Sequence, residues 1–189
     1  MRQLIGAINM TLDGFCDHTA VDPDPEIHQH YTDLLNSAGV ALYGRITYQL
    51  MEYWQPMVKN PTGNQSMDEF ALAIDKIPKI VFSHTLKNID WKSARLANKN
   101  LEETVLELKL QKGKDILACS PGLIVALTKL NLIDEYQLCV HPVIAGKGLP
   151  LFKNINEKVM LKLANTKIFN SGAVIFYYRP ASSDSRAGV

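Results

Sequence analysis

The chain has 189 residues, of which 47% are hydrophobic and 21% charged, so its size and composition fit one globular domain with a sizeable core. Its 20 basic and 19 acidic residues leave a net charge of +1, which gives no overall attraction to nucleic acid or to an anionic membrane. Sparse cysteines without C-x-x-C spacing and the lack of a long apolar stretch argue against a disulfide framework and a membrane span, so we expect a cytoplasmic protein.

Strand-like and helix-like segments alternate along the first two thirds of the chain. Short apolar runs bounded by turn residues indicate buried strands, and apolar residues at helical spacing indicate the helices between them. The segment 22–25, with its two prolines and two aspartates, is typical of a helix start. The elements expected here are strands over 4–10, 40–43, 79–82 and 116–119, and helices over 26–38, 47–54, 67–77, 101–112 and 123–132.

Three further strands are expected in succession, over residues 135–144, 159–168 and 173–178, with no helix between them. Strands that alternate with helices favour a parallel sheet, whereas consecutive strands favour antiparallel pairing. The sequence therefore predicts an α/β fold whose sheet is mixed but mainly parallel, with helices on both faces and an antiparallel C-terminal edge. We expect one domain over residues 1–180 and a disordered tail over 181–189.

The first strand-to-helix junction with residues suited to phosphate binding follows the strand over 40–43. Gly44 permits close approach of the backbone, Arg45 can form a forked pair with a phosphate, and Thr47 is expected to cap the next helix. A helix N-terminus also offers unpaired N–H groups and a partial positive charge. A capped helix with a surface arginine is an equally good interpretation of this junction alone.

Two more junctions have the same character. Ser83, His84 and Thr85 follow the strand over 79–82 and could hold an anion, although for this junction alone a polar turn is the better interpretation. In the third junction Ser120 is expected to be the helix N-cap, which would leave the amides of Gly122 and Leu123 facing outward. Three such junctions favour a nucleotide site more than one does, because the C-terminal ends of parallel strands meet at one edge of the sheet.

The order of short motifs along the chain resembles the dihydrofolate reductase fold. Within that fold it resembles the C-terminal reductase domain of the bifunctional riboflavin-biosynthesis deaminase-reductase and its stand-alone relatives. The resemblance covers nearly all of residues 3–179. It is carried by MTLDGF (10–15), GRITY (44–48), VFSHT (81–85), SPGL (120–123), LIDEY (132–136) and HPVIAGKGLPLF (141–152).

This resemblance implies a reductase with NADPH as its cofactor. It places the loop over residues 11–14 beside the nicotinamide. The residues implied for the cofactor are Gly44, Arg45 and Thr47 at its phosphates, Ser83, His84 and Thr85 around the adenosine 2′-phosphate, and Ser120 and Gly122 at the diphosphate.

Two positions depart from the family pattern. Relatives usually carry Gly-Gly or Gly-Ser at the third junction, and here the first of these positions is Cys119, whose side chain is expected to crowd the diphosphate. Relatives often carry arginine at position 84, and His84 weakens the preference for a 2′-phosphate when it is neutral.

The reducible substrate is expected to be a small heterocycle, of the pterin or ribosylaminopyrimidine type, or a carbonyl compound. Asp13 lies in the loop expected near the nicotinamide and is the candidate catalytic residue, although a turn-forming aspartate is the commoner role. Phe15 and Trp54, with Tyr48, are candidates for a flat aromatic wall, and each could equally lie in the core. Glu26 is a candidate carboxylate on the first helix, where an acid more often complements the helix dipole.

Other functions are less well supported by the sequence. His28 and His30 lie two apart and would not share a helix face, so we expect no metal site from them with Cys16 and His18. The zinc-deaminase motifs are absent, and the glycines at 146 and 148 lack the rest of a P-loop. Two classes stay open, a reductase and a non-catalytic nucleotide-binding or sensor module. Relatives often pair through the sheet edge, so we expect a homodimer in which the apolar strand 173–178 is covered by the second copy.

Overall fold

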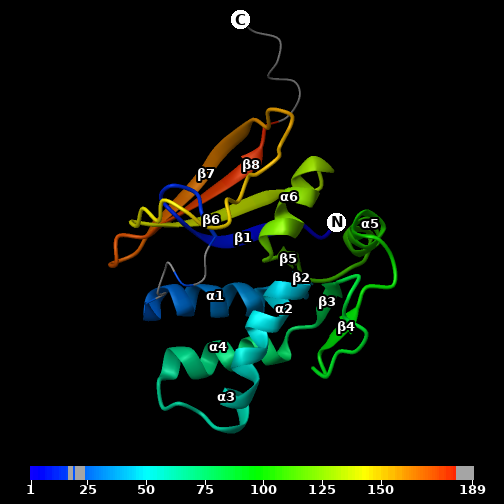
Figure 1. The fold of residues 1–189 in the computed structure, drawn as a ribbon, viewed down its shortest axis with the longest axis vertical. Helices are drawn as coiled ribbons and strands as arrows, with labels where there is room; N and C mark the ends of the chain where they lie inside the picture. The colour runs from blue at the N-terminus through cyan, green and yellow to red at the C-terminus, as the bar shows by residue number, and fades with distance from the viewer. Residues whose placement is uncertain (17–18, 20–23, 182–189) are drawn as a thin grey trace, which may run out of the picture.

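One eight-stranded sheet organises the chain in this computed structural model, which describes residues 1–16, 19 and 24–181 (Figure 1). The strand order is β4-β3-β2-β5-β1-β6-β8-β7. Pairing is parallel from β4 to β6 and antiparallel through β8 and β7, which confirms the expected mixed α/β sheet. The strands are β1 (Leu4–Thr11), β2 (Val40–Gly44), β3 (Lys79–Phe82), β4 (Ala94–Leu96), β5 (Ile116–Ala118), β6 (Glu135–His141), β7 (Leu161–Ile168) and β8 (Val174–Pro180).

Helices cover both faces of the parallel part of the sheet. They are α1 (Pro25–Ser37), α2 (Arg45–Met51), the short 3-10 helix η1 (Glu52–Trp54), α3 (Gln55–Lys59), α4 (Gln65–Lys76), α5 (Leu101–Leu110) and α6 (Pro121–Lys129). Alternate residues of β1 divide between two cores, because successive strand side chains point to opposite faces. Leu4 and Ile8 pack with α5 and α6, whereas Ile5 and Ala7 pack with α1 and α4. The helices α1 and α4 lie side by side on their face (Figure 1).

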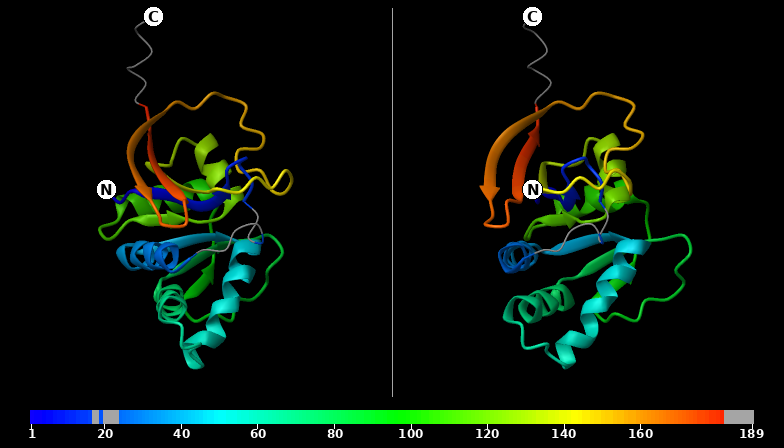
Figure 2. Two further views of the ribbon diagram at one scale, coloured as in Figure 1. Left: turned by 90° about the vertical axis from the view of Figure 1, so that its left-hand side faces the viewer. Right: turned by 60° about the vertical axis from the view of Figure 1, so that its left-hand side comes forward.

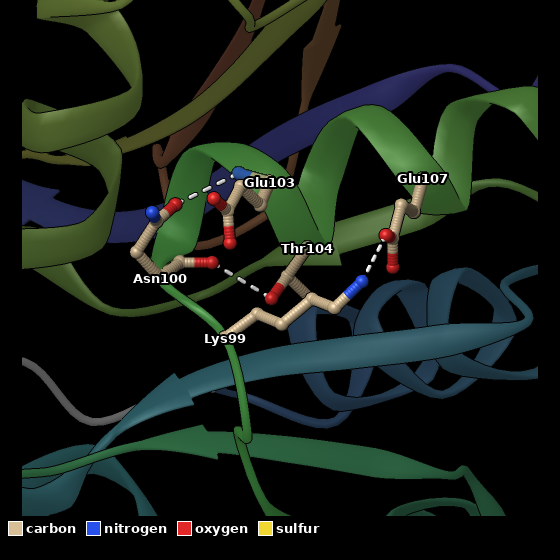
Figure 3. A network of polar contacts seen from close by, with 5 residues as sticks. All are labelled: Lys99, Asn100, Glu103, Thr104 and Glu107. Carbon is tan, nitrogen blue, oxygen red and sulfur yellow. Dashed lines mark hydrogen bonds and ion pairs between the residues drawn. The ribbon is translucent and has the colours of Figure 1, made fainter.

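Side-chain caps fix where several helices begin. Asp24 accepts a hydrogen bond from the Ile27 amide at 2.9 Å and so caps α1, while its neighbours Asp22 and Pro23 lie outside the described residues. At the start of α5, Asn100 accepts from the Glu103 amide at 2.9 Å (Figure 3). Such caps satisfy amides that have no partner within the helix and typically contribute about 1 kcal/mol.

Some expected boundaries differ from the structure. The helix predicted over 47–54 begins at Arg45, ends at Met51 and continues as η1 and α3, where Pro56 lies in the first turn. Strand β6 ends at His141 rather than at residue 144, because Pro142 has no N–H to donate to the sheet. The helix predicted over 123–132 begins at Pro121 and ends at Lys129. The three-residue edge strand β4 was not predicted, since it is too short to show an alternating pattern.

The C-terminal edge of the sheet corrects one expectation. The strand predicted over 173–178 is not an edge, because β8 lies between β6 and β7 and pairs with both. The exposed edge is β7, whose residues 162–168 are all exposed, and the β7–β8 pair extends beyond the helical layers (Figure 2). The homodimer stays a prediction, and β8 has no free edge for a second copy because it pairs with both β6 and β7. None of the helices in the described part of the chain is long and apolar enough to cross a membrane.

Candidate active site

The three predicted junctions lie at the C-terminal ends of three adjacent strands, β3, β2 and β5. Gly44 at the end of β2 is in register with Phe82 at the end of β3, and Leu42 of β2 is in register with Ala118 of β5. The expectation that the junctions share one sheet edge is therefore confirmed. They form a continuous row of loops of the kind that binds nucleotides in parallel sheets.

Ser120 joins two of these junctions directly. Its buried hydroxyl accepts a hydrogen bond from the Gly44 amide at 2.8 Å. Ser120 occupies the N-cap position of α6, as expected, but its side chain does not cap that helix. The hydroxyl proton of Ser120 and the first amides of α6 are therefore left to donate to another group.

Gly44 and Gly122 provide open space at this edge. Neither glycine has a positive φ, so neither is required by backbone conformation. A Cβ at Gly44 would only touch the Ser120 side chain at 3.8 Å, and a Cβ at Gly122 would meet nothing within 4 Å. Since neither conformation nor packing explains these glycines, the space beside them fits a ligand that approaches the backbone closely.

Arg45 and Thr47 lie in the first turn of α2. Arg45 is exposed, and its Nη1 donates to the Gln49 Oε1 at 3.1 Å, so its guanidinium keeps further donors free for a ligand. The expectation that Thr47 caps the helix is wrong, because Gly44 occupies the N-cap position and α2 begins at Arg45. Thr47 instead lines the cavity described below.

The second junction, after β3, is an ordered polar turn. Ser83 accepts hydrogen bonds from the amides of Thr85 at 3.1 Å and Leu86 at 3.0 Å. His84 and Thr85 are exposed at its tip. Both exposed side chains can contact a ligand that extends along the row from Arg45, although the Thr85 hydroxyl lies 3.4 Å from the Ser83 hydroxyl, which already accepts from its own turn.

A cavity of about 630 Å³ lies next to this row, on the α1 and α4 face of the sheet. Strands β1, β2 and β5 contribute its floor, and the helices on this face contribute its walls. Thr47 and Pro121, from the first turns of α2 and α6, belong both to the cavity and to the junctions. The aromatic and imidazole rings that line it are His28, Tyr31, Tyr43, Tyr53, Trp54 and Phe70.

Several of these rings contact one another. Trp54 packs edge-on against Phe70 with 4.7 Å between ring centroids, and the His28 ring lies 5.8 Å from that of Trp54. Burial lowers the pKa of His28, with Asp24 acting in the opposite direction, so the imidazole is neutral at pH 7. The walls therefore present flat, uncharged surfaces of the kind on which a planar ring stacks.

A polar network reaches the cavity at Asn9 of β1. The Asn9 Oδ1 is 3.0 Å from the Nε2 of buried His141 and accepts from the Tyr31 hydroxyl at 3.3 Å. With Oδ1 held by these two donors, the Asn9 amide group is fixed in orientation. Its Nδ2 is then the donor that the floor of the cavity offers to a ligand.

Two thiols also line the cavity. Burial raises the pKa of both Cys16 and Cys119 to about 12, so both are protonated at neutral pH and neither is an activated nucleophile. The Cys119 side chain, expected at the diphosphate, faces the cavity. Its bulk therefore narrows the cavity rather than the turn before α6.

The structure brings together only part of the predicted substrate set. Trp54 lines the cavity, whereas Phe15 and Glu26 do not. Phe15 forms a backbone bridge with Pro150, and the Glu26 carboxylate accepts from the Asn170 amide at 2.9 Å on the surface. Tyr48 is 2% exposed and packs against Trp91 in the core.

Asp13 connects two loops. Its carboxylate accepts from the Thr11 hydroxyl at 2.6 Å and from the amides of Ala145 at 3.1 Å and Gly146 at 2.7 Å. The Thr11 hydrogen bond, with those two amides, lowers the pKa of Asp13. Asp13 does not line the cavity, so the geometry gives it the role of fixing the loop over 142–150 against the end of β1.

We expect Asp13→Ala to release that loop. The amides of Ala145 and Gly146 should exchange with solvent at least about tenfold faster, because they lose their acceptor. Since folding lowers the Asp13 pKa, its contribution is present above about pH 4 and is lost as pH falls through the folded value. Hydrogen exchange followed by NMR, with exposed Asp33→Ala as the control, measures this, and unchanged protection of both amides would contradict it.

Several cavity residues were not predicted from the sequence. Phe70 and Ile74 lie four apart on α4, and that spacing is as typical of a core helix as of a cavity wall. Asn9 carried a usable signal, since a lone amide interrupts the apolar run of β1. In the parts of the chain that the structure describes, no three His, Cys, Asp or Glu residues gather to hold a metal, and His18 lies outside them.

Comparison with known proteins gives a family match over almost the whole chain. Residues 2–176 match the model of the RibD C-terminal domain. The uncharacterized protein YyaP of Bacillus subtilis (strain 168) is 35% identical over 185 residues, which span 94% of each chain.

Solved structures share the fold at low identity. A putative riboflavin biosynthesis protein from Shewanella sp. PV-4 has a TM-score of 0.70 at 18% identity, with 95% of this chain and 99% of that one covered. The diaminohydroxyphosphoribosylaminopyrimidine deaminase/5-amino-6-(5-phosphoribosylamino)uracil reductase of Thermotoga maritima has a TM-score of 0.62 at 15% identity. The match covers 95% of this chain but only 57% of that one.

Proposed function

Because the chain belongs to the RibD C-terminal domain family, we propose that it is an NADPH-dependent reductase acting on a small heterocyclic substrate. One observation carries this proposal. A row of three loops suited to phosphates, at the ends of β3, β2 and β5, shares residues with an aromatic cavity large enough for a planar ring. The phosphates of a bound cofactor would therefore lie next to the substrate cavity at Thr47 and Pro121.

The cofactor is assigned residue by residue. The open space at Gly44 and Gly122 fits its diphosphate, with the amides at the start of α6 and the Ser120 hydroxyl proton as donors. Arg45 and Thr47 lie beside Gly44 for the adjoining phosphates. His84 and Thr85, on the turn that Ser83 holds, lie next in the row for the adenosine 2′-phosphate.

The protein's part in the chemistry is to bind and orient. NADPH, when bound, would supply a hydride to the carbon of a C=O or C=N group, while the heteroatom takes a proton from water and NADP⁺ leaves. The aromatic walls, including Trp54, would hold the substrate ring, and the Asn9 Nδ2 would fix a ring acceptor atom. The loop that Asp13 fixes lies at the end of β1, beside the position that the family resemblance implies for the nicotinamide.

The first test is calorimetric titration of wild type and Arg45→Ala with NADPH and NADH. We expect NADPH to bind more tightly than NADH, and Arg45→Ala to weaken NADPH binding by about tenfold to a hundredfold, since a charge-assisted hydrogen bond to phosphate is removed. Lys59→Ala removes the same charge from the end of α3 and should bind NADPH as wild type does. If neither dinucleotide binds, the cofactor assignment is wrong.

A non-catalytic nucleotide-binding module on the same fold is the alternative. Such a module would bind NADPH and NADH as a reductase does, but it would not oxidise NADPH. Oxidation of NADPH at 340 nm with a panel of pterins, pyrimidines and quinones distinguishes the two. Tight NADPH binding without oxidation by any of these acceptors would favour the module.

A further inference from the structure

Among the residues that the structure describes, the cavity is lined without a charged side chain. Its walls and floor are aliphatic, aromatic, hydroxyl, amide and thiol groups, and the one imidazole, His28, is held among aromatic rings. Of the described residues that line it, none is an aspartate, glutamate, lysine or arginine. A buried phosphate in such a cavity would lose its hydration without gaining a cation.

The elements around the cavity offer no cation inside it either. Helix α1 contains no lysine or arginine. Residues 17–18 and 20–23, outside the described part, contain no lysine or arginine in the sequence. Beyond the described residues the one permanent positive charge is Arg186 in the C-terminal tail. Arg45 stands at the cofactor row, outside the lining.

The polar groups of the cavity suit a neutral ring with carbonyl or imine acceptors. The Asn9 amide is held by His141 and Tyr31 so that its Nδ2 is available, and the half-buried Thr47 adds a hydroxyl. Trp54 and Phe70 provide perpendicular faces 4.7 Å apart between centroids. A flat heterocycle can stack on one face and contact the other with its edge.

We propose that this cavity accepts an uncharged, unphosphorylated flat heterocycle with ring carbonyl or imine groups. The proposal rests on the reductase function proposed above and names the class of its hydride acceptor. It separates this chain from the Thermotoga maritima reductase, whose stated substrate carries a phosphoribosyl group. The cavity would discriminate against a phosphorylated heterocycle because it offers no cation. An aromatic cavity can bind the ring of a phosphorylated and of an unphosphorylated compound, but it leaves the phosphate of the first without a partner.

Binding of three flavin probes without cofactor tests this. Lumichrome, riboflavin and riboflavin 5′-phosphate share one flat ring system and differ in side chain and charge, and all are fluorescent. Titration with the full chain, followed by fluorescence anisotropy, should give dissociation constants for the first two within about fivefold of each other. The phosphate ester should bind at least about tenfold more weakly. An equal or tighter affinity for the ester, or no binding of any ring, would overturn the proposal.

A gain-of-function variant makes the test independent of folding defects. Tyr53 is 63% exposed at the rim, so Tyr53→Arg adds a cation there without disturbing the core. We expect it to bring the affinity for the phosphate ester to that for riboflavin or above. Leu72→Arg adds the same charge to the outer face of α4, where Leu72 is 55% exposed, and should leave the tenfold preference unchanged. Equal effects of both variants would overturn the proposal.

A loss-of-function pair locates the probe. Phe70→Ala should weaken lumichrome binding at least about tenfold, because one stacking surface is lost, whereas Leu72→Ala on the same helix should not. Circular dichroism confirms that both variants fold. These measurements are made without NADPH. If the chain binds the neutral ring but does not bind NADPH, the proposed reductase function is wrong and the proposed class of ligand is still supported.

Discussion

The Gly122→Asp variant is expected to unfold at a higher temperature than wild type and to bind NADPH at least about a hundredfold more weakly. Gly122 is the second residue of α6, and its Cβ position is open. A carboxylate in the first turn complements the helix dipole by about 0.3–1 kcal/mol, and removing glycine from a helix adds to that gain. The same carboxylate would occupy the space assigned to the diphosphate, where two like charges cost several kcal/mol.

The Gly122→Asp variant is informative because its stability is expected to rise while its affinity for NADPH falls. Thermal unfolding gives the stability, with an expected rise of about 2–4 °C in Tm, and calorimetry gives the affinity. Gly122→Ala is the matched control, since it also stabilises the helix but adds no charge, so its loss of affinity should be much smaller. If Gly122→Asp binds NADPH like wild type, the diphosphate does not lie at α6. If stability and affinity fall together, the glycine is structural.

The fold and the row of junctions could be predicted because their signals are local. A strand that ends in Gly44, or a Ser-Pro-Gly sequence before an apolar helix, is readable within a few residues. Parallel pairing then brings separate junctions to one edge, as β3, β2 and β5 show. The resemblance to the reductase family used the same local motifs in order.

The cavity was not predictable in the same way. Asn9, Tyr31 and Phe70 come from three elements, and each has a pattern typical of core residues. Whether such side chains meet or leave space between them depends on how α1 and α4 pack on the sheet, which no local pattern contains. Of these three residues only Asn9 carries a local signal, as an amide in an apolar strand that was not used in the prediction.

Two polar residues have hydrogen-bond partners that the sequence did not identify. Asp13 was a candidate catalytic residue, with a turn-forming role as the commoner interpretation, and its carboxylate accepts from the amides of Ala145 and Gly146. Ser120 was expected to cap its own helix, and it accepts from Gly44, 76 residues earlier in the chain. Short polar side chains satisfy the nearest free backbone amide, and tertiary structure decides which one that is.

Ser120→Ala should lower stability and NADPH affinity together, in contrast to Gly122→Asp. Ser120 is 4% exposed, and its hydroxyl accepts a hydrogen bond from the Gly44 amide at 2.8 Å. Its removal leaves that amide without an acceptor at a cost of about 1–2 kcal/mol. It also releases the β2 junction from the β5 junction and removes a donor to the diphosphate, so affinity should fall about tenfold.

Chemical denaturation and calorimetry on Ser120→Ala separate the two roles of this hydroxyl. Ser66→Ala, which removes a hydroxyl whose hydrogen bond to Asn64 is exposed, serves as the control and should change neither quantity by a comparable amount. A loss of affinity at unchanged stability would mean that Ser120 acts only on the cofactor and that its bond to Gly44 contributes nothing. A loss of stability at unchanged affinity would place the diphosphate away from this junction. Loss of both is the result expected if one hydroxyl holds the two strand ends together and completes the cofactor site.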